Sequence, residues 1–91
     1  MASASPPPPR LVVPDLGVPG GTITLSLWLV PEGAAVLAGD RVAELLCGAA
    51  TVDLEAPVTG RLARQFVDED DVVAPGTTVA EFEPAGERGD P

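Results

Sequence analysis

Lysine, histidine and tyrosine are absent from this 91-residue sequence, and cysteine occurs once. The absence of lysine excludes every modification that needs a side-chain amine. The single cysteine, Cys47, excludes an intramolecular disulfide framework and favours a reducing compartment, so we expect a cytoplasmic protein. Aromatic residues are also scarce, with only Trp28, Phe66 and Phe82. Valine, leucine, alanine and isoleucine must therefore fill the core, which favours closely packed strands.

Positive charge is equally scarce. The chain has five arginines and 14 acidic residues, which gives a formal net charge of -9. Such a chain repels phosphate backbones and anionic lipids, so we expect neither nucleic acid nor a membrane surface as a partner. No apolar run reaches the length of a membrane span, and residues 1–10 lack the apolar centre of a secretory signal. The length allows one small domain without a large catalytic pocket.

Composition divides the chain into three parts. Residues 1–9 contain four consecutive prolines and are expected to form an extended tail or linker. Residues 84–91 are polar and rich in turn formers, and we expect a flexible C-terminal tail there. The folded domain is therefore predicted to span residues 10–83.

Short strands are the predicted elements of this domain. Glycine or proline interrupts each apolar run within about ten residues, which leaves no room for a long helix. Residues 22–27 and 51–55 alternate polar and apolar side chains, and residues 61–66 do so more weakly. That period is typical of strands with one buried face. Several short strands with regular turns predict an all-β sandwich or barrel.

An internal repeat is the most specific signal. Residues 30–45 align without a gap on residues 67–82, and seven of the 16 positions are identical. Neither copy can bury its apolar face alone, so we expect the two copies to pack face to face. After Val42 and Val79 the alternation is broken at the same place in both copies, which predicts equivalent bulges.

Residues 11–83 resemble the lipoyl/biotinyl attachment domain family. The motifs that carry the resemblance occur in the family's order, at residues 13–17, 21–23, 30–36, 39–44, 56–62 and 75–79. The resemblance implies a flattened barrel of two antiparallel four-stranded sheets related by a quasi-twofold axis, also described as a barrel-sandwich hybrid. The lipoyl branch fits better than the biotinyl branch, because biotinyl domains carry methionines beside their lysine and Met1 is the only methionine here.

The family's members display a lysine on a hairpin between the two halves, and lipoate or biotin is attached to it. Residues 50–57 read A-T-V-D-L-E-A-P and align with the family's A-T-V-E-V-E-A-P, which places Ala49 at the position of the lysine. The family's acidic flank E-T-D is replaced by Leu46, Cys47 and Gly48. We therefore expect an intact hairpin over Cys47, Gly48, Ala49 and Ala50 that carries no cofactor.

Three other features of the sequence are candidates for a chemical or binding role. The Cys47 thiol could substitute for the lysine, but no histidine or lysine is present to activate it, and we favour a packing role. The acidic run 68–71 is interpreted as a solvated turn rather than a metal site, because it aligns with the turn 31–34 of the other copy. Trp28 is expected to pack at the end of the domain, with a partner-binding surface as the alternative.

These observations predict a non-catalytic, unmodified lipoyl-like domain that serves as an interaction or scaffolding module. The resemblance suggests a 2-oxoacid dehydrogenase or a related multienzyme complex as its protein partner. The competing interpretation is an acyl- or thiol-carrier that uses Cys47, or the N-terminal amine, in place of lysine. A third interpretation is a fold retained within a larger complex, with contacts made by Trp28 or by an exposed strand edge. The sequence does not indicate an oligomeric state.

Overall fold

The computed structural model describes residues 7–17 and 21–85, and within these residues every regular element is a strand. The eight strands are β1 (Arg10–Val12), β2 (Ile23–Trp28), β3 (Ala35–Val36), β4 (Arg41–Cys47), β5 (Ala50–Glu55), β6 (Gly60–Gln65), β7 (Val72–Val73) and β8 (Thr78–Pro84). The predicted alternating segments 22–27, 51–55 and 61–66 correspond to β2, β5 and β6, each displaced by one residue or less at either end.

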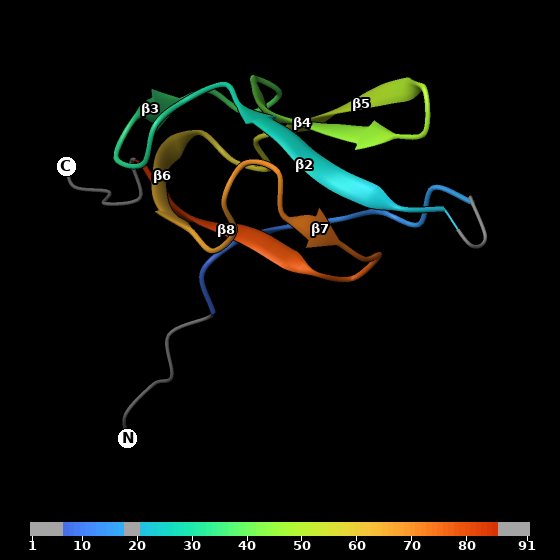
Figure 1. Ribbon diagram of the computed structural model, residues 1–91. Coiled ribbons are helices and arrows are strands. Elements are labelled where there is room, and N and C mark those ends of the chain that lie inside the picture. The colour runs from blue at the N-terminus through green and yellow to red at the C-terminus, as the bar shows by residue number, and fades with distance from the viewer. Residues whose placement is uncertain (1–6, 18–20, 86–91) are drawn as a thin grey trace, which may run out of the picture.

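The strands form two four-stranded antiparallel sheets, in the orders β1-β8-β6-β3 and β5-β4-β2-β7. Figure 1 shows the two sheets as the layers of a flattened sandwich, with the β4–β5 hairpin projecting at one end. The predicted all-β fold of two four-stranded sheets is confirmed. Within the described residues, no helix is long and apolar enough to cross a membrane.

The two copies of the repeat are interleaved, which corrects the expectation that they simply pack face to face. Each sheet takes two strands from the N-terminal half and two from the C-terminal half. Four strands make this exchange. From the N-terminal half β1 pairs with β8 and β3 with β6, and from the C-terminal half β5 pairs with β4 and β7 with β2. Neither half can therefore complete a sheet without the other.

The core lies between the sheets and is entirely apolar among the described residues. Its largest fully buried side chains are Phe82, Leu25, Leu45, Leu62, Val13, Val42 and Val79. The predicted bulges are confirmed: the register shifts at Val42 in the β4–β5 pair and at Val79 in the β1–β8 pair. A bulge lets two consecutive side chains face inward, and both valines are followed by fully buried alanines, Ala43 and Ala80.

The predicted tails lie mostly outside the described residues, which exclude 1–6 and 86–91. Of the residues that are described, the Pro9 carbonyl accepts a hydrogen bond from the Phe82 amide at 2.9 Å, and β8 continues to Pro84. The Ala85 amide donates to the Thr59 carbonyl at 3.0 Å. Backbone pairing thus reaches a residue or two beyond the predicted limits 10 and 83.

Candidate functional site

The β4–β5 hairpin is the candidate site, and its backbone follows from its sequence. Cys47 and Ala50 are the last paired residues, so only Gly48 and Ala49 form the turn. Gly48 has a φ of 63°, whereas Ala49 is not among the residues with positive φ. Positive φ at the first central position of a two-residue hairpin favours glycine, which the chain supplies. The predicted hairpin is present, and its paired strands reach Cys47 and Ala50.

Ala49 lies at the tip of this hairpin and is exposed, as are Gly48 and Ala50. These three residues present only backbone groups and two methyl groups to a modifying enzyme. The prosthetic group implied by the resemblance requires a side-chain nucleophile for its amide bond. The residues of the tip therefore do not fit that group, and no transfer step can be derived through it.

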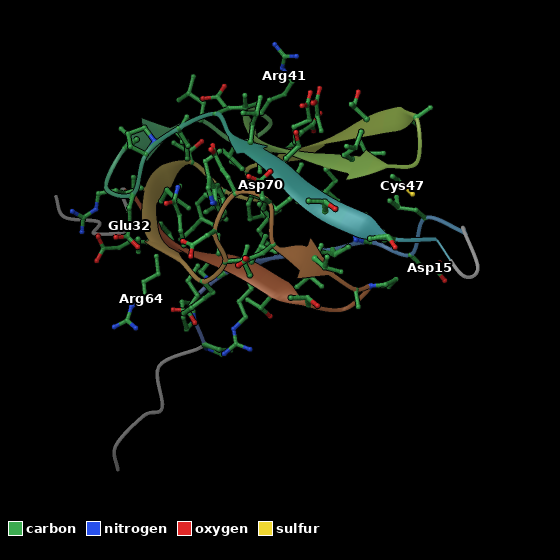
Figure 2. All side chains as sticks on the ribbon, viewed as in Figure 1. Asp15, Glu32, Arg41, Cys47, Arg64 and Asp70 are labelled. Carbon is green, nitrogen blue, oxygen red and sulfur yellow. The ribbon has the colours of Figure 1, made fainter. Side chains whose placement is uncertain are left out.

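Cys47 is the nucleophile nearest to the tip, and it points into the protein. The residue is 8% exposed and belongs to the core cluster, and its cross-strand neighbours are Ile23 on β2 and Ala50 on β5. Figure 2 shows the side chain near the hairpin end of the molecule. The adjacent Leu46 faces outward and is 39% exposed. The alternation of the strand thus turns the thiol inward and places a leucine on the surface.

Trp28 is half-buried and packs against the core cluster, in agreement with the favoured interpretation. Its indole Nε1 donates to the Val67 carbonyl at 3.0 Å. The equivalent residue of the other copy, Gln65, uses its Nε2 to donate to the Val30 carbonyl, also at 3.0 Å. Both side chains thus connect the two halves.

The acidic run 68–71 forms a turn. Asp71 Oδ2 accepts from the Asp68 amide at 2.8 Å, and Glu69 Oε2 accepts from the Trp28 amide at 2.9 Å. Asp70 has a φ of 76°, close to the 93° of Gly33 at the equivalent position. Within residues 7–17 and 21–85 no three potential ligands are grouped to hold a metal ion. The turn 31–34 and the run 68–71 also share a backbone hydrogen bond, because the Ala34 amide donates to the Pro31 carbonyl and the Asp71 amide to the Asp68 carbonyl, both at 3.1 Å.

Two glutamates have a structural role that the sequence pattern did not predict. Glu32 Oε2 accepts from the Gln65 amide at 2.8 Å, which mirrors the contact of Glu69 with Trp28. Their identity in the repeat was the signal that could have found them. Each carboxylate crosses from a turn of one half to the end of a long strand of the other half. Both bonds lie at the ends of β2 and β6, outside the β4–β5 hairpin.

Comparisons with known proteins agree with this geometry. The sequence profile described as "Biotin-requiring enzyme", for the biotin/lipoyl family, matches residues 10–82. The dihydrolipoyllysine-residue acetyltransferase component of the pyruvate dehydrogenase complex of Zymomonas mobilis subsp. mobilis (strain ATCC 31821 / ZM4 / CP4) is 40% identical over 65 residues. That match covers 70% of this chain and 15% of the relative, so the chain spans a small part of the relative's length.

A solved structure, that of a single-chain, multi-domain long-chain acyl-CoA carboxylase, superposes with a TM-score of 0.73. The superposition covers 97% of this chain and 8% of the carboxylase chain, at 23% sequence identity. This likeness shows the fold. Because the family profile covers residues 10–82, most of the sequence, this chain belongs to the biotin/lipoyl attachment domain family.

Proposed function

We propose that this chain is an unmodified lipoyl-like domain that acts as a non-catalytic interaction or scaffolding module. The observation that carries the proposal is the hairpin tip, where Gly48 and Ala49 stand in an otherwise complete attachment-domain fold. Ala49 occupies the attachment position, and the 91 residues contain no lysine that could replace it. The rest of the fold is kept, which supports a role that needs the surface and not the swinging arm.

The proposed partner is a component of a 2-oxoacid dehydrogenase complex or of a related cytoplasmic multienzyme complex. The relative from Zymomonas is named as a component of the pyruvate dehydrogenase complex. A domain tethered near the active sites of such a complex can occupy a docking position without carrying a substrate. We propose no catalytic residue, metal or cofactor for this chain.

The competing function, a carrier that uses Cys47, requires an accessible thiol. Cys47 is 8% exposed and packs in the core cluster, so acylation would require the end of β4 to open. The N-terminal amine, the other nucleophile considered, lies outside the described residues. Burial of the thiol therefore favours the interaction module.

Intact mass spectrometry tests the absence of modification. The chain is co-expressed with a lipoate ligase and a biotin ligase, with the matching region of the Zymomonas acetyltransferase component as the control. We expect the mass of the bare polypeptide under conditions that modify the control. A lipoyl or biotinyl mass increment, or an acyl adduct on Cys47, contradicts the proposal.

A binding measurement tests the interaction role. Isothermal titration of the chain against the purified dehydrogenase, acyltransferase and dihydrolipoyl dehydrogenase components of its own organism should detect one saturable partner. Absence of binding to every component contradicts the proposed partner.

A further inference from the structure

The outer faces of the two sheets occupy equivalent positions of the internal repeat, and they carry different side chains. On the sheet β1-β8-β6-β3, Arg61 lies opposite Glu83 and Arg64 lies opposite Glu81. Arg61 and Glu83 form an ion pair, and Glu81 forms another with Arg10. This face is therefore covered by opposite charges in cross-strand register, which favours the sheet.

The equivalent face of the sheet β5-β4-β2-β7 lacks this ionic pattern. Near the hairpin, four cross-strand neighbours form one row across this face. They are Val72 on β7, Thr24 on β2, Leu46 on β4 and Thr51 on β5. The row carries no charge, and Val72 and Leu46 are 71% and 39% exposed. A neutral row with two exposed apolar side chains thus replaces the ion pair of the other face.

The next row of this face contains two acidic residues directly opposite each other on neighbouring strands. Glu44 lies directly opposite Leu27 on one side and Asp53 on the other. Leu27 is 44% exposed. Asp53 has Arg41 at 3.4 Å, whereas Glu44 has no ion-pair partner among the described residues. Like charges directly opposite one another destabilise a sheet, so this pair has a cost in the isolated domain.

Glu44 and Glu81 occupy equivalent positions of the repeat, so the surroundings of the two carboxylates can be compared within one molecule. Glu81 lies between Arg10 and Arg64, the residues opposite it on the two neighbouring strands. At the corresponding positions around Glu44 stand an apolar side chain and a second carboxylate. One half of the protein satisfies this carboxylate internally, and the other leaves it beside exposed apolar surface.

We propose that this surface, the Leu46 face (Leu27, Glu44, Leu46, Asp53 and Val72), docks a protein partner that directs a lysine or arginine to Glu44 and lays apolar side chains on the neutral row. The inference rests on the proposed function, because it names the surface through which the module acts. A basic partner removes the repulsion between the two carboxylates and covers the exposed apolar side chains at the same time.

The negative charge of this face favours a different protein, and not a second copy of this chain, as the docked partner. Two copies that met through this face would bring Glu44 and Asp53 of each against the other, and each chain has a formal net charge of -9. A basic partner is attracted by the same field. The face also adjoins the hairpin, since Leu46 and Thr51 immediately flank the residues Cys47 to Ala50. A protein docked here therefore lies beside the tip that carries Ala49.

A peptide titration locates the docking surface before the partner itself is identified. The probe is an acetylated, amidated peptide of about ten residues that alternates leucine and arginine, followed by backbone amide shifts of the isotope-labelled full chain. We expect the largest shifts at residues 24, 27, 44, 46, 51, 53 and 72. A glycine–arginine peptide should bind about tenfold more weakly, since it lacks the apolar contacts. Shifts spread over both faces, or centred on the acidic run 68–71, would overturn the proposal.

Two matched pairs of variants separate this face from general charge attraction. Leu27→Arg copies Arg64 and supplies Glu44 with an internal cation, so we expect about tenfold weaker peptide binding without loss of thermal stability. Arg64→Leu, the reverse exchange on the other face, should leave binding within about twofold of the wild type. Glu44→Gln should weaken binding, whereas Glu81→Gln, with the same change of charge, should not. Equal effects on the two faces would overturn the proposal.

Binding of the dehydrogenase complex components to the wild-type chain and to the Leu27→Arg variant distinguishes an error in the docking surface from an error in the proposed function. If a component binds the wild-type chain and the Leu27→Arg variant equally, the partner is confirmed and the Leu46 face is wrong. If no component binds the wild type while the peptide binds at the Leu46 face, the proposed partner is wrong and the docking surface stands.

Discussion

Glu69 accepts a hydrogen bond from the backbone amide of Trp28 at 2.9 Å, across 41 residues of sequence. The same bond occurs in the other half, where Glu32 accepts from the amide of Gln65 at 2.8 Å. Each glutamate satisfies a backbone donor at the end of a long strand, where the sheet ladder ends. The pair explains why glutamate is identical at this position of the repeat.

Replacement of either glutamate by alanine should lower the free energy of unfolding by about 1 kcal/mol, because a backbone amide loses its acceptor. Glutamine keeps an oxygen acceptor and should cost less. Urea denaturation of the four variants measures both effects. Glu55→Ala removes an exposed carboxylate that accepts no side-chain hydrogen bond among the described residues, and it should cost little. Equal losses for all three positions would contradict the role of Glu32 and Glu69.

Asp70 and Gly33 allow a reciprocal exchange, because they occupy the same turn with φ values of 76° and 93°. Left-handed backbone is less favourable for aspartate than for glycine by about 1 kcal/mol, partly offset by the greater freedom of glycine in the unfolded chain. We expect Asp70→Gly to stabilise the protein slightly and Gly33→Asp to destabilise it. Thermal melts at matched ionic strength check the two signs. Destabilisation by Asp70→Gly would show that the aspartate side chain contributes more than its backbone strain.

Gly60 is required by close packing and not by its dihedral angle. A Cβ at this position would lie 2.1 Å from the carbonyl oxygen of Glu83 on the neighbouring strand. Gly60→Ala must therefore push β6 away from β8, and we expect a loss of about 3 kcal/mol. Gly76→Ala is the control, because its Cβ meets nothing within 4 Å and only its φ of 90° opposes the change. The control should lose about 1 to 2 kcal/mol. A smaller loss for Gly60→Ala than for the control would contradict this account.

The buried thiol of Cys47 should react slowly with an aromatic disulfide reagent in the native protein. The residue is 8% exposed and packs in the core cluster, so the reagent must wait for local opening. We expect reaction at least about tenfold slower than in guanidinium chloride, measured by absorbance of the released thiolate. Thr51→Cys, combined with Cys47→Ala, provides an exposed control on the adjacent strand. Equal rates for Cys47 and the control would revive the thiol-carrier interpretation.

Ala49→Lys tests whether the nucleophile alone was lost from the hairpin. The turn should present the new side chain, but the acidic flank of the family is replaced by Leu46, Cys47 and Gly48. We expect little or no lipoylation of this single variant by a lipoate ligase, measured by intact mass. Restoring glutamate, threonine and aspartate at positions 46–48 together with Lys should increase modification. Efficient modification of Ala49→Lys alone would show that the flank is not required.

Much of the fold could be predicted from local pattern. Alternation located β2 and β5, and the interrupted alternation after Val42 and Val79 located both bulges. The two-residue strands β3 and β7 could not be located in this way, because two residues carry no period. Their partners, β6 and β2, belong to the opposite half of the chain.

Some features of the candidate site could likewise be predicted from the sequence, whereas others could not. The absence of lysine and the glycine and alanine at the hairpin tip are properties of residue identity, so they could be read before the fold was known. The inward direction of Cys47 and the neighbours of the two glutamates depend on strand pairing. Glu44 lies beside Asp53 and Leu27, whereas Glu81 lies between two arginines. The physical reason is that cross-strand neighbours are set by backbone hydrogen bonds between residues far apart in the chain. Two identical glutamates therefore acquire different environments.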